Sequence, residues 1–227
     1  IQDLQFYALR HTSHENGKLF KDRTLEIMSV NTDSLLTITN NLILPLSRDI
    51  GHPLGIQVLD EFLFSFEKPA QRDLIWSVPG FLNAPEKYKW STTQNLNLEE
   101  EFHLTKDDVF DGCPSIYVWA LSNLNNSFRK QSRDELMRWA KTTPDEFWKL
   151  FLKYANVNDP QIKSDLLSIL TCLVYDGAND TLIKSASDWV CANILSADKI
   201  EQCMDVSLRY YSIAIVKKSI ICGLNSE

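Results

Sequence analysis

The sequence predicts an all-α protein made of HEAT-like helical hairpins stacked as an α-solenoid segment. Apolar residues recur at spacings of three and four along much of the chain, and the alternating pattern of strands is nearly absent. Nearly all of the 8 Pro stand where a helix would begin, and only 7 Gly interrupt the chain. Clear helix pairs in the second half recur at about 35 to 45 residues, a spacing typical of HEAT repeats.

Residues 1–82 are expected to form N-terminal helical hairpins. The periodicity predicts helices over 25–30 and over 35–46, the second capped by the polar segment Asn31-Thr32-Asp33. Two further helices are predicted to open at Pro53 and at Pro69, because proline is favoured in the first turn of a helix.

Residues 83–113 are predicted to be a polar loop insert, because apolar periodicity lapses and Asn, Thr, Lys and Glu dominate. The segment Lys87-Tyr88-Lys89-Trp90 lies there, a mixture of aromatic anchor and charge that is typical of protein interfaces. We therefore expect these four residues to contact a protein partner. The alternative is a packed or disordered connector.

Residues 114–227 are expected to continue the helical repeats of the first part. Thr143-Pro144-Asp145-Glu146 predicts a capping box, in which the Thr hydroxyl accepts from the Glu146 amide and the Glu146 carboxylate reaches back. Asn158-Asp159-Pro160 predicts another capped helix, ending at Gly177 in the left-handed conformation. Later helices are predicted from Asp180 and over 206–222.

The charge balance argues against nucleic acid and anionic membranes as main partners. Lys and Arg number 23 and Asp and Glu 30 among the 227 residues, which gives a net charge of −7. No run of about 18 apolar residues occurs, and neither an initiator Met nor a leader opens the sequence. We expect a cytoplasmic piece of a longer protein with no membrane contact. Its oligomeric state is left open.

The five cysteines form an odd set without a CxxC pair. Most lie in apolar helical stretches, so we expect buried thiols in a reducing compartment rather than a disulfide framework. Five of the six tryptophans likewise lie in predicted helices and are expected mainly in the core. These are Trp76, Trp119, Trp139, Trp148 and Trp189.

No motif for catalysis or cofactor binding is found in the sequence. GxxxxGK[ST], GxGxxG and HExxH are all absent, so we expect no enzyme activity, cofactor or metal in this segment. An acidic stretch is the one candidate metal site, and a solvated loop is its favoured interpretation. The minority alternative is an all-α metal-dependent hydrolase using Glu100, His103, Asp107 and Asp108. His52 is expected to donate to a backbone carbonyl rather than to act as a ligand or base.

Several segments share order and spacing with a known family over most of the chain. His52-Pro53-Leu54-Gly55 precedes Arg72-Asp73-Leu74-Ile75-Trp76-Ser77, and Trp119-Ala120-Leu121-Ser122 precedes Arg133-Asp134 and Asn158-Asp159-Pro160. With the later Leu208-Arg209-Tyr210-Tyr211, the chain resembles the helical C-terminal region of bacterial STAND-type ATPases, which include the antiviral AVAST group.

The resemblance implies a protein-binding segment of a larger bacterial NTPase that senses a phage protein, with the ATPase motifs outside this segment. A HEAT-like scaffold unrelated to defence is the alternative. The matching residues are expected to be structural, since a helical Arg can fork onto carboxylates or carbonyls of a neighbouring hairpin. They are His52, Pro53, Arg72, Asp73, Arg133, Asp134, Asp159, Pro160 and Arg209.

Overall fold

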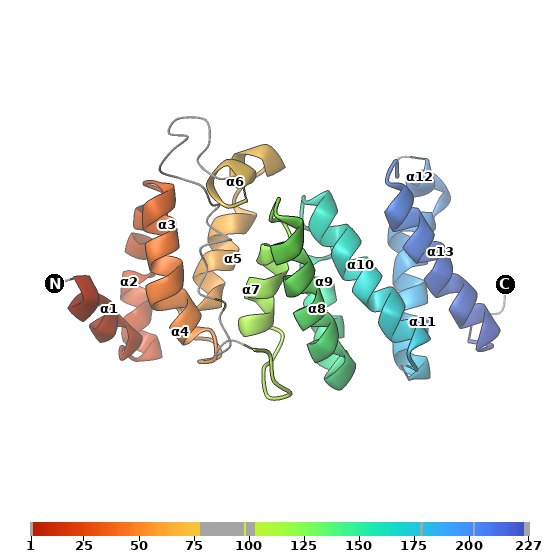
Figure 1. The fold of residues 1–227 in the computed structure, drawn as a ribbon, viewed down its shortest axis with the longest axis horizontal. Coiled ribbons are helices and arrows are strands. Elements are labelled where there is room, and N and C mark those ends of the chain that lie inside the picture. The colour runs from red at the N-terminus through yellow and green to blue at the C-terminus, as the bar shows by residue number, and fades with distance from the viewer. Residues whose placement is uncertain (1, 78–97, 99–102, 178, 202, 225–227) are drawn as a thin grey trace. The chain divides into compact units, whose positions relative to one another are not determined.

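The computed structural model describes residues 2–77, 98, 103–177, 179–201 and 203–224. Across these residues the regular structure is helical and contains no strand, which confirms the all-α prediction. The chain divides into two compact units, Ile1–Glu135 and Leu136–Glu227, whose elements are labelled in Figure 1. The division falls inside one helix, α8 (Asn126–Thr142).

The first unit begins with more helix than the periodicity predicts. Its helices before α8 are α1 (Gln2–Arg10), α2 (His14–Met28), α3 (Thr32–Ile38), α4 (Leu44–Leu46), α5 (Ile56–Phe64), α6 (Pro69–Ile75) and α7 (Cys113–Ala120). The helix predicted over 25–30 is only the end of α2, which starts where Ser13 accepts a hydrogen bond from the Asn16 amide. Its earlier turns carry few apolar residues, so the sequence shows no apolar periodicity there.

The helix predicted over 35–46 contains a change of hydrogen-bond period. Asn31 caps its start by accepting from the Ser34 amide at 2.8 Å, and a π-helical segment, η1 (Thr39–Ile43), links α3 to α4. α5 begins at Ile56 rather than at the predicted Pro53. Pro53 instead lies in a turn, which is closed by the Gly55 amide donating to the His52 carbonyl at 2.9 Å.

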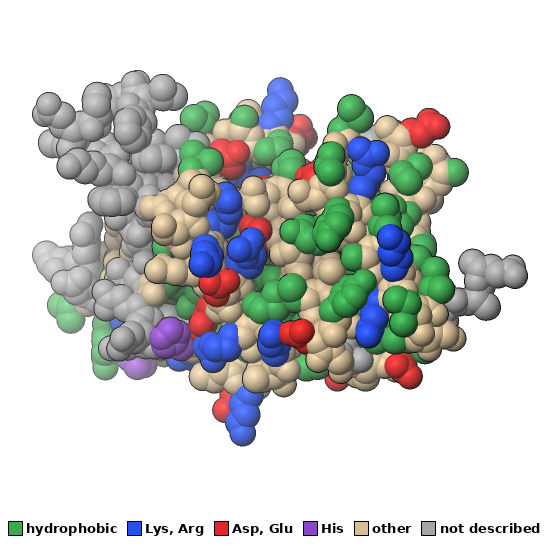
Figure 2. Space-filling model, turned by 45° about the vertical axis from the view of Figure 1, so that its right-hand side comes forward, with side chains coloured by type: hydrophobic (Ala, Val, Ile, Leu, Met, Phe, Trp, Pro, Cys, Tyr) green, Lys and Arg blue, Asp and Glu red, His purple; other side chains and the backbone are tan. Residues whose placement is uncertain are grey.

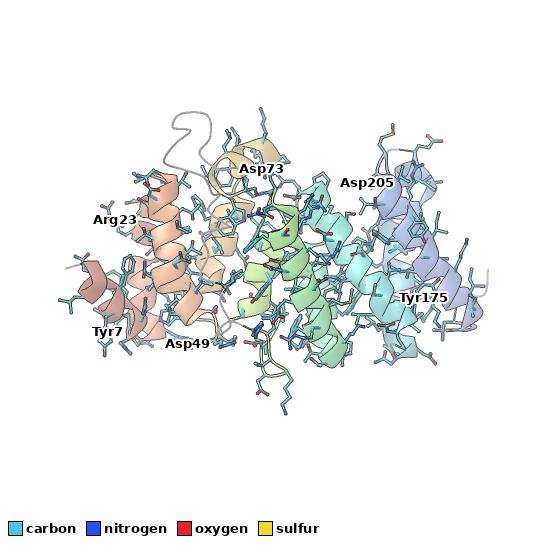
Figure 3. The ribbon with its side chains drawn as sticks, viewed as in Figure 1. Tyr7, Arg23, Asp49, Asp73, Tyr175 and Asp205 are labelled. Carbon is cyan, nitrogen blue, oxygen red and sulfur yellow. The ribbon has the colours of Figure 1, made fainter. Side chains whose placement is uncertain are left out.

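The second unit packs its helices around the last one. It holds α9 (Pro144–Tyr154), α10 (Pro160–Tyr175), α11 (Asp180–Val190), the π-helical segment η4 (Cys191–Leu195), α12 (Ala197–Ile200) and α13 (Val206–Ile221). Both α10 and α11 lie against α13. Tyr175, labelled in Figure 3, donates its hydroxyl to the Ala214 carbonyl at 3.1 Å and so ties α10 to α13.

One of the two predicted caps of this unit is confirmed and the other is wrong. Asp159 accepts from the amides of Gln161 and Ile162 at 2.9 and 3.0 Å, and Gly177 has a φ of 100° after the helix ends. Thr143 makes no side-chain cap, although α9 does begin at Pro144. Its hydroxyl instead donates to the Trp139 carbonyl at 2.9 Å, an acceptor near the end of α8 that also takes the Thr143 main-chain amide at 3.0 Å.

The expectation of buried thiols is also corrected. Only Cys113 is buried, whereas Cys203 is half-buried and Cys172, Cys191 and Cys222 are exposed. Cys172 and Cys191 face solvent from α10 and η4, and Cys222 follows the end of α13, which an apolar sequence context does not reveal. The tryptophans divide similarly: Trp76, Trp119 and Trp139 are buried, and Trp148 and Trp189 are half-buried.

Candidate functional site

The partner-contact residues expected from the sequence cannot be placed. Trp90, Tyr88, Lys87 and Lys89 lie outside the described residues, and so does Glu100 of the candidate metal site.

Of the candidate metal site, Asp108 and His103 contact neighbouring elements of the fold. Asp108 is only 7% exposed and bonds Arg48 at 3.1 Å and the Thr105 amide at 2.7 Å. His103 Nδ1 lies 3.2 Å from Glu135 Oε1, and Asp107 is exposed. The described residues contain no group of three or more His, Cys, Asp or Glu placed to hold a metal ion. The interpretation as a solvated loop is therefore wrong for Asp108, which is buried and hydrogen-bonded.

His52 is held in one neutral tautomer. The Leu54 amide can only donate, so the ring Nδ1 accepts from it at 3.1 Å. The Thr12 carbonyl can only accept, so Nε2 carries the proton and donates at 3.0 Å. The side chain is 1% exposed. His52 therefore ties the turn before α5 to the segment between α1 and α2, as a structural histidine would.

The other residues of the resemblance lie in varied surroundings. Arg72 is fully buried on α6, with its guanidinium carbon 5.6 Å from the centre of the Trp119 ring. Pro53 and Asp159 are buried as well. Asp73, Arg133 and Arg209 are half-buried, and Asp134 and Pro160 are exposed.

The second unit contains a cavity that we take as the candidate site. We call it the α9–α13 cavity; its volume is about 210 Å³. Its lining comes from every helix of the unit after α8. The lining residues are Phe151, Ala155, Asn156, Lys163, Leu166, Leu167, Trp189, Asn193, Ile194, Lys199, Cys203 and Leu208.

The floor of the α9–α13 cavity is apolar and rigid. Phe151, Leu166 and Leu167 are each at most 2% exposed. Phe151 meets Trp189 edge-on at 4.8 Å between ring centres and stacks with Trp148 at 5.4 Å. Aromatic contacts of this kind hold ring positions, so the half-buried Trp189 presents a fixed apolar surface to whatever enters.

A π-helical turn shapes one wall of the cavity. η4 follows α11 directly and supplies Asn193 and Ile194 to the lining. Asn193 donates its amide Nδ2 to the Trp189 carbonyl at 2.9 Å, which leaves its side-chain oxygen as an acceptor. Turns with this wider period are rare and occur frequently at functional sites.

The rim of the cavity is basic. Lys163 on α10 makes no ion pair with any described residue, and the Lys199 ammonium donates to the Ala192 carbonyl at 3.0 Å. None of the lining residues is acidic. Figure 2 shows basic and hydrophobic side chains interspersed on one face of the molecule.

The α9–α13 cavity can therefore hold an apolar group against Trp189 and attract negative charge at its edge. The sequence analysis expected Trp189 mainly in the core and missed Lys163, Asn193 and Lys199. No pattern in the sequence marks them, because a π-helical turn and the convergence of α9, α10 and α12 arise only in three dimensions. Comparison of the chain with protein-family models, curated proteins and solved structures gave no significant match. Within the described part of the chain, no helix is long and apolar enough to span a membrane.

Proposed function

We propose that this chain is a protein-binding module of HEAT-like helical hairpins that contacts its partner through the α9–α13 cavity. The observation that carries the proposal is an apolar floor, ended by the half-buried Trp189, beneath a rim where Lys163 makes no ion pair with a described residue. Interface hot spots combine these features, since an anchoring side chain fills a pocket and charged residues surround it.

The size of the cavity favours a protein partner over a small-molecule ligand. Its volume of about 210 Å³ lies below the range of roughly 300–1,000 Å³ of small-molecule sites. A single side chain of a partner fits that space better than a metabolite does. Further apolar contact is available on α13 of the same unit, where Val206 is 72% exposed and Tyr210 is 69% exposed.

The identity of the partner rests on the family resemblance. We propose that the chain belongs to the sensor region of a larger bacterial NTPase of the AVAST group, acts in the cytoplasm without catalysis or a cofactor of its own, and binds a phage protein. The segments around His52-Pro53, Arg72-Asp73 and Asp159-Pro160 support this proposal. A HEAT-like scaffold unrelated to defence uses the same cavity for another protein.

The test places a bulky residue at the mouth of the cavity. Asn156 is exposed and makes no hydrogen bond to a described residue, so Asn156→Trp covers the opening without disturbing the floor. Gln131→Trp, at an exposed position on α8, is the matched control. In cells that express the full-length protein and are challenged with phage, we expect Asn156→Trp to lose protection and Gln131→Trp to retain it.

A second measurement separates binding from defence. A photo-crosslinking amino acid at position 156 should form a covalent adduct with one defined protein, whereas the same residue at position 131 should not. If position 156 forms an adduct but the unaltered protein does not protect cells from phage, the result would favour the scaffold alternative. Equal labelling at both positions would refute the cavity as the contact site.

A further inference from the structure

We propose that the α9–α13 cavity selects an aliphatic or aromatic side chain that lies within an acidic segment of the partner protein. This inference rests on the proposed protein-binding function and adds the chemistry of the segment that is bound. It is carried by the contrast between the buried apolar floor and the two lysines at the rim.

The apolar part of the specificity comes from the floor. Phe151, Leu166 and Leu167 expose almost no surface, so a side chain that reaches them leaves water entirely. The side chains of Phe151, Leu166 and Leu167 offer no hydrogen-bonding group to a polar atom there. A buried polar group without a partner is costly, so the cavity rejects polar side chains.

The acidic part of the specificity comes from charge. Lys163 and Lys199 are the charged lining residues, and both are positive. Two carboxylates near Lys163 in the sequence accept hydrogen bonds within α10. Asp159 caps α10 by accepting from the main-chain amides of Gln161 and Ile162, and Asp165 accepts from the side-chain amide of Gln161. The lining of the cavity therefore carries positive charge in a chain of net charge −7, and it attracts carboxylates that flank the inserted side chain.

Two asparagines can bind the main chain of the same segment. The Asn193 side-chain oxygen is left as an acceptor because its Nδ2 donates to Trp189. Asn156 at the mouth offers both a donor and an acceptor. Amide groups of this kind recognise a peptide backbone whatever its sequence, so they orient the segment while the floor and the lysines select it.

The experiment is a selection from a displayed peptide library. Each peptide carries one fixed Leu or Phe with four random residues on either side, and the chain of 227 residues is the immobilised target. We expect enriched peptides to carry Asp or Glu beside the fixed residue. One enriched acidic peptide is then synthesised. Lys163→Glu should weaken the binding of this peptide at least tenfold, whereas Lys217→Glu, at an exposed position of α13, should leave the affinity for the peptide unchanged.

The outcomes separate this inference from the proposed function. Enrichment of neutral or basic flanks, or equal weakening by both lysine substitutions, would overturn the acidic segment while leaving protein binding in place. No enrichment at all would overturn both. If an enriched peptide binds equally well after its fixed Leu or Phe is replaced by Gly, the apolar floor does not contribute to binding.

Discussion

Trp76 donates its indole Nε1–H to the main-chain carbonyl of Trp119, 2.9 Å away, and both side chains are fully buried. The Trp119 indole in turn donates to the Asp60 carboxylate at 2.7 Å. The Trp119 carbonyl has a second donor, the Ser122 hydroxyl at 2.8 Å. The two indoles therefore connect α5, α7 and the end of α6. The Trp119 indole donates to a charged carboxylate, whereas the Trp76 indole donates to a neutral main-chain carbonyl.

We expect Trp119→Phe to destabilise the chain more than Trp76→Phe. Both substitutions remove similar volume, but the first removes a bond to a carboxylate, which contributes about 1.5–3 kcal/mol, and the second a bond to a carbonyl, which contributes about 1 kcal/mol. Urea midpoints measure the difference. Trp189→Phe is the control, since this half-buried indole makes no hydrogen bond to a described residue. Equal losses of stability for Trp119→Phe and Trp76→Phe would contradict the difference between the two hydrogen bonds.

The two helix starts at proline should respond differently to loss of the preceding side chain. Asp159→Ala removes an acceptor used by two amides and should cost about 1 kcal/mol of unfolding free energy. Thr143→Ala removes no cap bond, only the hydroxyl that donates to Trp139, and should cost less than half as much. Denaturant unfolding of both variants checks the order, and a larger effect at Thr143 would show that it caps α9 in solution.

Gly112 should be more sensitive to alanine than Gly177. A Cβ at position 112 would lie 2.6 Å from the Ser47 carbonyl oxygen, so backbone must shift at a cost of about 3 kcal/mol. At Gly177 the space is open and only the φ of 100° is strained, which costs about 1–2 kcal/mol. Thermal unfolding compares the two. Gly112→Ala should also speed alkylation of Cys113, whose thiol contacts Ser47 at 2.8 Å, whereas Gly177→Ala should not.

Cys113 should make the stability of the chain fall at alkaline pH. Burial raises the pKa of its thiol, despite an opposing contribution from the hydrogen bond with Ser47. An unfolded thiol ionises near a pKa of about 8.5, so above that pH the unfolded chain binds fewer protons than the folded one and the unfolding free energy decreases.

The matched variant is Cys113→Ala. Its unfolding free energy should fall less steeply between about pH 8 and about pH 9.5 than that of the unaltered chain, as measured by urea unfolding at each pH. The other four cysteines are present in both proteins and cancel in the comparison. Identical slopes would mean that the Cys113 thiol is not buried in the folded state.

The sequence by itself determined the elements whose signals are local. The all-α class, the start of α6 at Pro69, the Asp159 cap and the end of α10 before Gly177 all follow from side chains acting within a turn or two of their own position. Such interactions depend on near neighbours in the chain, so a pattern of residues is enough to read them.

Only the tertiary structure decided how residues distant in the chain meet. Thr143 was free to bond the end of α8 instead of capping α9, and Asp108 was buried by Arg48, sixty residues away. The α9–α13 cavity is of the same kind, since Phe151, Lys163, Trp189 and Lys199 share it only because separate helices converge and η4 widens by a residue. Packing competes with local preference for each polar group, and the sequence gives no measure of that competition.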